Sequence, residues 1–137
     1  MFLTAASDRE ARAGRTMKQI GRPVIDSNGL ERTTFRDRKL ELFVWRANGL
    51  TKAFELHYGI ETENEWSMLW TERGGISFHR LVPSSGAPVM IPVEPEQLPI
   101  CDLHAEFVVR SRLIDESIRR IVLIQLSKAT RNYGIDS

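Results

Sequence analysis

The sequence predicts an α+β domain in which a four-stranded antiparallel β-meander is followed by two α-helices packed on one face of the sheet. From residue 39 to residue 82, segments rich in β-branched and aromatic residues alternate with turn dipeptides. Prolines then interrupt the chain between Pro83 and Pro99. Beyond them, apolar residues recur at helical spacing as far as Ala129, which completes the strand-then-helix order.

The first predicted hairpin is centred on Asn48-Gly49, between the strand-like segments Lys39–Ala47 and Leu50–Tyr58. Asparagine and glycine both accept the positive φ of a type I′ turn, which makes this the strongest local signal in the chain. A two-residue turn at this point would place Phe43 opposite Phe54.

The second predicted hairpin joins Glu65–Thr71 to Ile76–Val82 through a tight turn at Arg73-Gly74 or Gly74-Gly75. Either turn would put Trp70 on the same face as His79. We expect the next segment, Val89 to Val93, to be an edge strand or a surface loop because it contains a proline.

Two helices complete the predicted domain. Asp102 is expected to cap the first, which runs through Leu113. Asp115 is expected to cap the second, from Glu116 to about Ala129, whose wide apolar stripe indicates that it is covered on two sides.

Strand parity, including the parity of the loop from Gly59 to Asn64, divides the predicted sheet into two faces. The core face collects Phe43, Trp45, Phe54, Leu56, Tyr58, Trp66, Met68, Trp70, His79 and Leu81. The outer face carries Leu40, Leu42, Val44, Glu55, His57, Ser67, Leu69, Ile76, Phe78 and Arg80. Six of these ten residues are apolar, which favours burial of this face in a two-fold homodimer. A small-molecule ligand on this face is the alternative.

Residues 1–38 differ from the segment 39–137 that forms the predicted domain. Basic residues recur in them without an apolar period, which predicts a flexible basic leader or an assigned start that lies too early, with Met17 as an in-frame alternative. A nucleic-acid accessory role through this leader is a third hypothesis, and interspersed acidic residues weaken it.

Composition restricts the function classes. The chain of 137 residues has 19 basic and 18 acidic side chains, so its net charge of +1 gives no large field for nucleic acid or anionic lipid. No apolar stretch approaches the roughly 20 residues that span a bilayer, and no signal peptide is evident, so we expect a cytoplasmic protein. The lone Cys101 predicts no disulfide and no zinc site, and we expect an inert, partly buried thiol.

The candidate ligand-binding residues are Glu55, His57 and Arg80, which share the predicted outer face. A carboxylate two residues from an imidazole could orient it and raise its pKa, as an acid–base site needs. No nucleophile or oxyanion donor accompanies them, so no catalytic residue is predicted and a non-enzymatic module is favoured; a rim ion pair is the structural alternative. We expect His79 in the core and His104 in solvent, and this scatter of histidines predicts neither a metal nor a cofactor.

Three stretches, Phe54–Tyr58, Ser67–Trp70 and Gly75–Leu81, resemble a group of small uncharacterised bacterial proteins in which a comparable meander precedes two helices. The resemblance covers about Lys39 to the C-terminus. It implies the fold and leaves out the leader, and it implies no activity, cofactor or site. The sequence therefore favours a homodimeric binding module, with a small-molecule-binding protein or small enzyme as the alternative.

Overall fold

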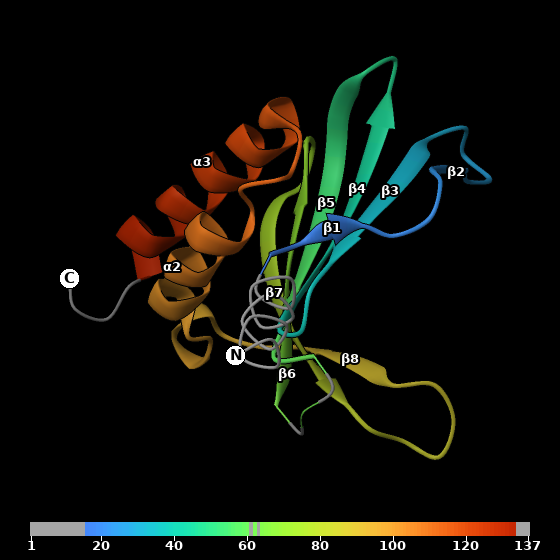
Figure 1. Ribbon diagram of the computed structural model, residues 1–137. Helices are drawn as coiled ribbons and strands as arrows, with labels where there is room; N and C mark the ends of the chain where they lie inside the picture. The colour runs from blue at the N-terminus through green and yellow to red at the C-terminus, as the bar shows by residue number, and fades with distance from the viewer. Residues whose placement is uncertain (1–15, 61, 63, 134–137) are drawn as a thin grey trace, which may run out of the picture.

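The computed structural model describes residues 16–60, 62 and 64–133, which form an antiparallel sheet with both helices on one face (Figure 1). Its strands are β1 (Lys18–Gln19), β2 (Val24–Ile25), β3 (Glu31–Arg36), β4 (Leu40–Ala47), β5 (Leu50–Tyr58), β6 (Glu65–Thr71), β7 (Gly75–Val82) and β8 (Val89–Pro92). A 3₁₀ turn at Pro95–Gln97 precedes α2 (Ile100–Arg110) and α3 (Glu116–Tyr133). The strand order is β1-β3-β4-β5-β6-β7-β8, and β2 also pairs with β3.

The predicted α+β class is confirmed, but the expected number of strands was wrong. The described part of the chain has an eight-stranded sheet, of which the predicted meander forms the centre, β4 to β7. Strand β3 pairs with β4 from Glu31 opposite Arg46 to Arg36 opposite Glu41, and it buries Thr33 and Phe35. The segment from 18 to 36 therefore belongs to the sheet, although the sequence placed it in a leader; residues 1–15 lie outside the described residues.

The first hairpin turns where the sequence predicts, but a β-bulge follows it. Asn48 and Gly49 have φ values of 53° and 79°, as a type I′ turn requires. The register then shifts between Trp45 and Arg46, so that Lys52 is the extra residue on β5. One extra residue exchanges the two faces of a strand relative to its neighbour.

The bulge corrects the predicted faces of β4. Phe43 lies opposite Glu55 instead of Phe54, and Phe54 lies opposite Val44. The aliphatic side chains of β4, namely Leu40, Leu42 and Val44, are fully buried beneath the helices. Phe43 and Trp45, predicted to be core residues, lie on the outer face, the face of the sheet opposite the helices.

The second hairpin has a three-residue loop instead of the predicted two-residue turn. Thr71 pairs with Gly75, and Gly75 takes the positive φ of 74° that such a loop needs at its end. Trp70 therefore lies opposite Ile76, and β7 is turned over relative to the prediction. His79 and Leu81 move to the outer face, whereas Ile76, Phe78 and Arg80 move to the helix side. The predicted parity of β5 with β6 is confirmed, because Tyr58 lies opposite Trp66.

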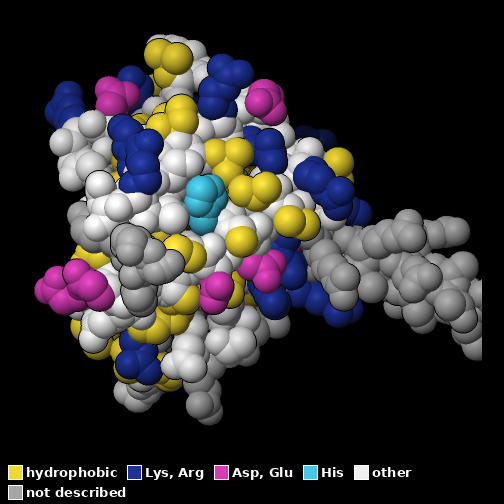
Figure 2. Space-filling model, turned by 90° about the vertical axis from the view of Figure 1, so that its left-hand side faces the viewer, with side chains coloured by type: hydrophobic (Ala, Val, Ile, Leu, Met, Phe, Trp, Pro, Cys, Tyr) yellow, Lys and Arg dark blue, Asp and Glu magenta, His cyan; other side chains and the backbone are white. Residues whose placement is uncertain are grey.

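The core lies between the sheet and the two helices. Phe54, Leu56 and Met68 on the sheet belong to the same buried cluster as Phe107 of α2 and Val122 of α3. The outward surfaces of the helices keep some exposed hydrophobic residues, and hydrophobic, basic and acidic side chains are interspersed on this side of the molecule (Figure 2).

The helix ends differ partly from the prediction. Asp102 lies in the first turn of α2 while Pro99 holds the cap position, and α2 ends at Arg110 rather than at Leu113. Asp115 does precede α3: its carbonyl oxygen accepts the first hydrogen bonds of the helix, from the N–H groups of Ile118 and Arg119.

At one edge of the sheet, β8 confirms the predicted edge strand. The N–H of Val93 donates to the carbonyl oxygen of Phe78, 3.1 Å away, so the backbone groups of Val93 point inward. Because these groups alternate along a strand, those of Met90 and Pro92 point away from the sheet. Proline has no N–H, and Pro88 directly precedes the strand, so Met90 presents the one outward N–H between residues 88 and 92.

Because neighbouring residues of β4 lie on different faces, substituting them should destabilise the protein by different amounts. Leu42→Ala should lower the free energy of unfolding by about 2–5 kcal/mol, because it empties a fully buried position. Phe43→Ala should cost less, about 1 kcal/mol, because this ring lies on the outer face. Urea denaturation of both variants measures the difference, and a larger loss for Phe43→Ala would contradict the bulged register.

Candidate functional site

Two of the three predicted site residues meet on the outer face. Nε2 of His57 lies 2.7 Å from a carboxylate oxygen of Glu55, two residues earlier on β5. Nδ1 of the same ring lies 3.0 Å from Glu65 at the start of β6. Because His57 pairs with Ser67, Glu65 is the diagonal neighbour of the histidine across the two strands. Glu65 was not among the site residues predicted from the sequence.

The two carboxylates fix the charge of the imidazole. Burial is the largest single influence and lowers the pKa of His57, but hydrogen bonds and charges from Glu55, and then from Glu65, outweigh it and raise the pKa above the ordinary value of 6.5. An imidazolium donates through both nitrogens and has no lone pair left. In this arrangement His57 holds its proton instead of accepting one from a substrate.

The imidazole of this cluster is also shielded from solvent, although both helices lie on the opposite face. The ring of Phe43 meets the imidazole edge-on at 5.6 Å between centroids, and the guanidinium of Arg32 lies over Phe43 at 5.9 Å. His57 is therefore only 6% exposed. A ligand in solvent would contact the rim of this cluster rather than the imidazole.

Arg80, the third predicted site residue, does not join the cluster. The three-residue loop before β7 places it on the helix-side parity, where its guanidinium lies over the ring of Trp66 at 5.8 Å. The predicted Glu55, His57 and Arg80 site is therefore not assembled, and this part of the prediction was wrong.

The remaining histidines and the cysteine lie outside this cluster. His79 pairs with Ser67 across β6 and β7, and Nδ1 of His79 and Oγ of Ser67 are both buried, with no hydrogen-bond partner among the described residues. His104 lies 3.1 Å from the hydroxyl of Thr130, which ties α2 to α3 instead of leaving the imidazole in solvent as expected. Cys101 is exposed, not partly buried.

A groove of about 720 Å³ opens where α2 passes the turn between β3 and β4. Three elements far apart in the sequence build it: this turn, the end of β5 and one face of α2. The lining residues are Arg38, Lys39, Tyr58, Asp102, Ala105, Glu106, Val109 and Arg110. We refer to this site as the α2 groove.

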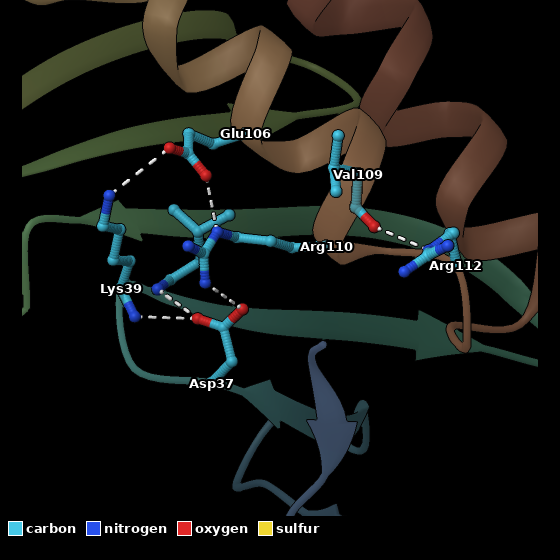
Figure 3. A network of polar contacts seen from close by, with 7 residues as sticks. Asp37, Lys39, Glu106, Val109, Arg110 and Arg112 are labelled. Atoms are coloured by element: carbon cyan, nitrogen blue, oxygen red, sulfur yellow. Dashed lines mark hydrogen bonds and ion pairs between the residues drawn. The ribbon is translucent and has the colours of Figure 1, made fainter. Parts of the chain in front are cut away.

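A buried ion pair lies beside the α2 groove (Figure 3). Nη1 of Arg110 is 2.9 Å from Oδ2 of Asp37, whose side chain is completely buried. The other carboxylate oxygen of Asp37 accepts the backbone N–H groups of Lys39 and Leu40 at 2.8 and 2.9 Å. The carboxylate thus closes the turn locally and holds the arginine of a distant helix.

Glu106 completes the network on the open side. Its carboxylate accepts a hydrogen bond of 2.6 Å from Nε of Arg110 and lies 3.4 Å from Nζ of Lys39. The hydrogen bond from Arg110 is the main cause that lowers the pKa of Glu106. For Arg110, burial acts to lower the pKa, but the bonds to Glu106 and Asp37 raise it above its ordinary value.

Tyr58 supplies a phenol to the α2 groove. Burial first, and then the carboxylates of Glu106 and Asp102, raise the pKa of this phenol. The hydroxyl therefore stays protonated and can donate a hydrogen bond. Three of the groove's titratable groups, Tyr58, Glu106 and Arg110, thus have shifted pKa values, as binding and active sites often do.

The α2 groove was not predicted from the sequence. The one signal in the sequence was the spacing of Asp102, Glu106 and Arg110, which puts three charged side chains on one face of a helix. Nothing in the sequence indicated that this face would meet Asp37.

No protein-family model, curated protein or solved structure matches the chain. The resemblance to small bacterial proteins thus stays a prediction. Across residues 16–60, 62 and 64–133, no three histidine, cysteine or acidic side chains are placed to hold a metal ion. Helices in that part of the chain are too short or too polar to cross a membrane.

The raised pKa of His57 predicts a pH-dependent stability. A group whose pKa is higher in the folded than in the unfolded protein stabilises fully below the unfolded pKa, and this stabilisation is lost as pH rises through the folded pKa. The free energy of unfolding should therefore fall as pH rises from about 6.5. Urea denaturation across this range should show the fall in the native protein and a flatter profile in His57→Gln. Equal slopes for the two proteins would contradict the assignment.

The buried ion pair predicts a large cost for removing one charge. Asp37→Asn should lower the free energy of unfolding by about 3–5 kcal/mol, since it leaves the guanidinium of Arg110 without its buried partner. Glu106→Gln is the control, because that side chain is 30% exposed and its loss should cost about 1 kcal/mol. Chemical denaturation measures both variants. Equal losses of unfolding free energy would contradict the larger contribution of the buried pair between Asp37 and Arg110.

Proposed function

We propose that this protein binds a small polar molecule in the α2 groove. The observation that carries the proposal is the convergence of three groups with shifted pKa values, Tyr58, Glu106 and Arg110, in one groove of about 720 Å³. Small-molecule sites typically measure 300–1,000 Å³ and combine apolar walls with a few polar groups. The α2 groove lies in this size range, but its lining is mainly polar, with Ala105 and Val109 as the two aliphatic side chains, which favours a polar ligand.

Preorganised donors support a binding role. The Arg110 side chain is 9% exposed, and Nε and Nη1 are occupied by Glu106 and Asp37. Nη2 has no protein partner in the described part of the chain, so its two N–H groups can donate to a ligand. An arginine already fixed by two carboxylates loses little side-chain entropy when a ligand binds.

Binding is favoured over catalysis by the identity of the lining residues. Among the described residues, no serine, threonine, cysteine or histidine lines the α2 groove, and these residue types supply most nucleophiles and general bases. Glu106, the best placed carboxylate, is engaged by Arg110 and Lys39. This supports the non-enzymatic role that the sequence favours.

The other two hypotheses have less support. The homodimer was inferred from an apolar outer face, but Leu42, Val44 and Phe78, which made that face apolar, lie in the core. The nucleic-acid role was inferred from a basic leader, but Arg32 and Arg36 contact Phe43 and Glu41 within the sheet. Dimerisation itself stays a prediction.

A groove-filling substitution tests the proposal. A panel of small polar molecules is screened by NMR, and ligands are expected to shift the amide signals of Lys39, Tyr58 and Glu106. Ala105→Trp should abolish this binding while the protein stays folded, since Ala105 is an exposed helical position on the groove wall. Lys128→Trp, at an exposed position of α3, is the matched control and should bind normally. The proposal fails if the panel yields no ligand for these residues, or if Ala105→Trp still binds.

A further inference from the structure

The charges of the α2 groove are arranged along the helix axis. Asp102, Glu106 and Arg110 are four residues apart and form one stripe. At 1.5 Å per residue, Asp102 and Arg110 are separated by about 12 Å along the helix. The stripe thus runs from an acidic to a basic end.

The middle of the stripe is already neutralised, whereas its ends are not. Glu106 is bound by Arg110 and Lys39. Asp102 has no ion-pair partner among the described residues, and it lies in the first turn of α2. At the other end, Arg38 follows directly after Asp37, the partner of Arg110, and makes no ion pair within the described ranges. A negative charge at one end of the α2 groove and positive charge at the other are therefore left for a ligand.

Between the charged ends, the wall is small and apolar. Ala105 is exposed, and Val109 is 55% exposed on the same helix. Tyr58, at the end of strand β5 across the groove, adds an aromatic ring and a hydroxyl donor. This middle section of the α2 groove suits a ligand that has small side chains and hydrogen-bonding groups.

Taken together, these features define the ligand class, and this step rests on the proposed function. We propose that the α2 groove binds a short linear peptide of about three residues with free ends. Its ammonium group pairs with Asp102, and its carboxylate contacts Arg38 and the free N–H groups of Arg110. An extended chain covers about 3.4 Å per residue, so three residues span about 10 Å, close to the separation of the charged ends.

Capped peptides test which end is recognised. Trialanine, N-acetyl-trialanine and trialanine amide are titrated into the full chain, and the dissociation constant is measured by NMR. Each cap removes one terminal charge, so each capped peptide should bind about three- to tenfold more weakly than trialanine.

Two substitutions assign the ends. Asp102→Asn should weaken trialanine and the amide but leave the acetylated peptide unchanged, since that peptide has no ammonium group. Arg38→Gln should weaken trialanine and the acetylated peptide but leave the amide unchanged. Glu72→Gln and Arg73→Gln, in the exposed hairpin loop at the other end of the strands, are the charge-matched controls and should change none of the three constants.

The outcomes separate the ligand class from the site. If all three peptides shift the groove residues with constants within about twofold of each other, terminal recognition is wrong and the α2 groove remains a binding site. If no peptide binds while a molecule of the screening panel does, this inference fails alone. If neither the peptides nor the panel bind, the proposed function fails with it.

Discussion

The ion pair between Asp37 and Arg110 connects the parts of the molecule that the proposed function uses. Asp37 closes the turn between β3 and β4 through the backbone N–H groups of Lys39 and Leu40. Arg110 holds the last turn of α2 against that turn, and its carbonyl oxygen accepts the N–H of Met17 at 2.8 Å. Taking two charges out of water costs several kcal/mol, which only well-directed partners offset. The three hydrogen bonds that the Asp37 carboxylate accepts form such an arrangement, which keeps a guanidinium in place beside the α2 groove.

Local signals in the sequence were sufficient for the class of the fold but not for its faces. The Asn48-Gly49 turn and the α3 helix depend on neighbouring residues, and both were predicted. The faces of β4 and β7 were wrong because each depends on a single residue. Lys52 bulges out of β5, and the second hairpin has one more loop residue than expected. Apolar residues on both faces of β4 concealed the error, since the aromatic Phe43 and Trp45 fit a core pattern as well as the aliphatic Leu42 and Val44 do.

Whether a candidate site could be predicted also depended on how far apart its residues lie in the sequence. Glu55 and His57 are two residues apart on one strand, so their meeting followed from strand periodicity alone. Placing Glu65 beside His57 required the register of β5 with β6. Placing Arg80 on the correct face required the length of the loop between β6 and β7. The α2 groove could not be predicted from the sequence because its ion pair joins residues that are 73 positions apart. Only the packing of α2 on the sheet brings them together.

The edge strand β8 limits how this protein can associate with others. Strand addition needs a row of outward N–H and C=O groups. Along residues 88–92, Pro88 and Pro92 leave Met90 with the one outward N–H, and the opposite edge of the described sheet is divided between the two-residue strands β1 and β2. An incoming extended chain would find no continuous ladder at either margin. Despite its eight strands, the described sheet therefore offers little unpaired backbone at either edge for end-to-end growth into fibrils.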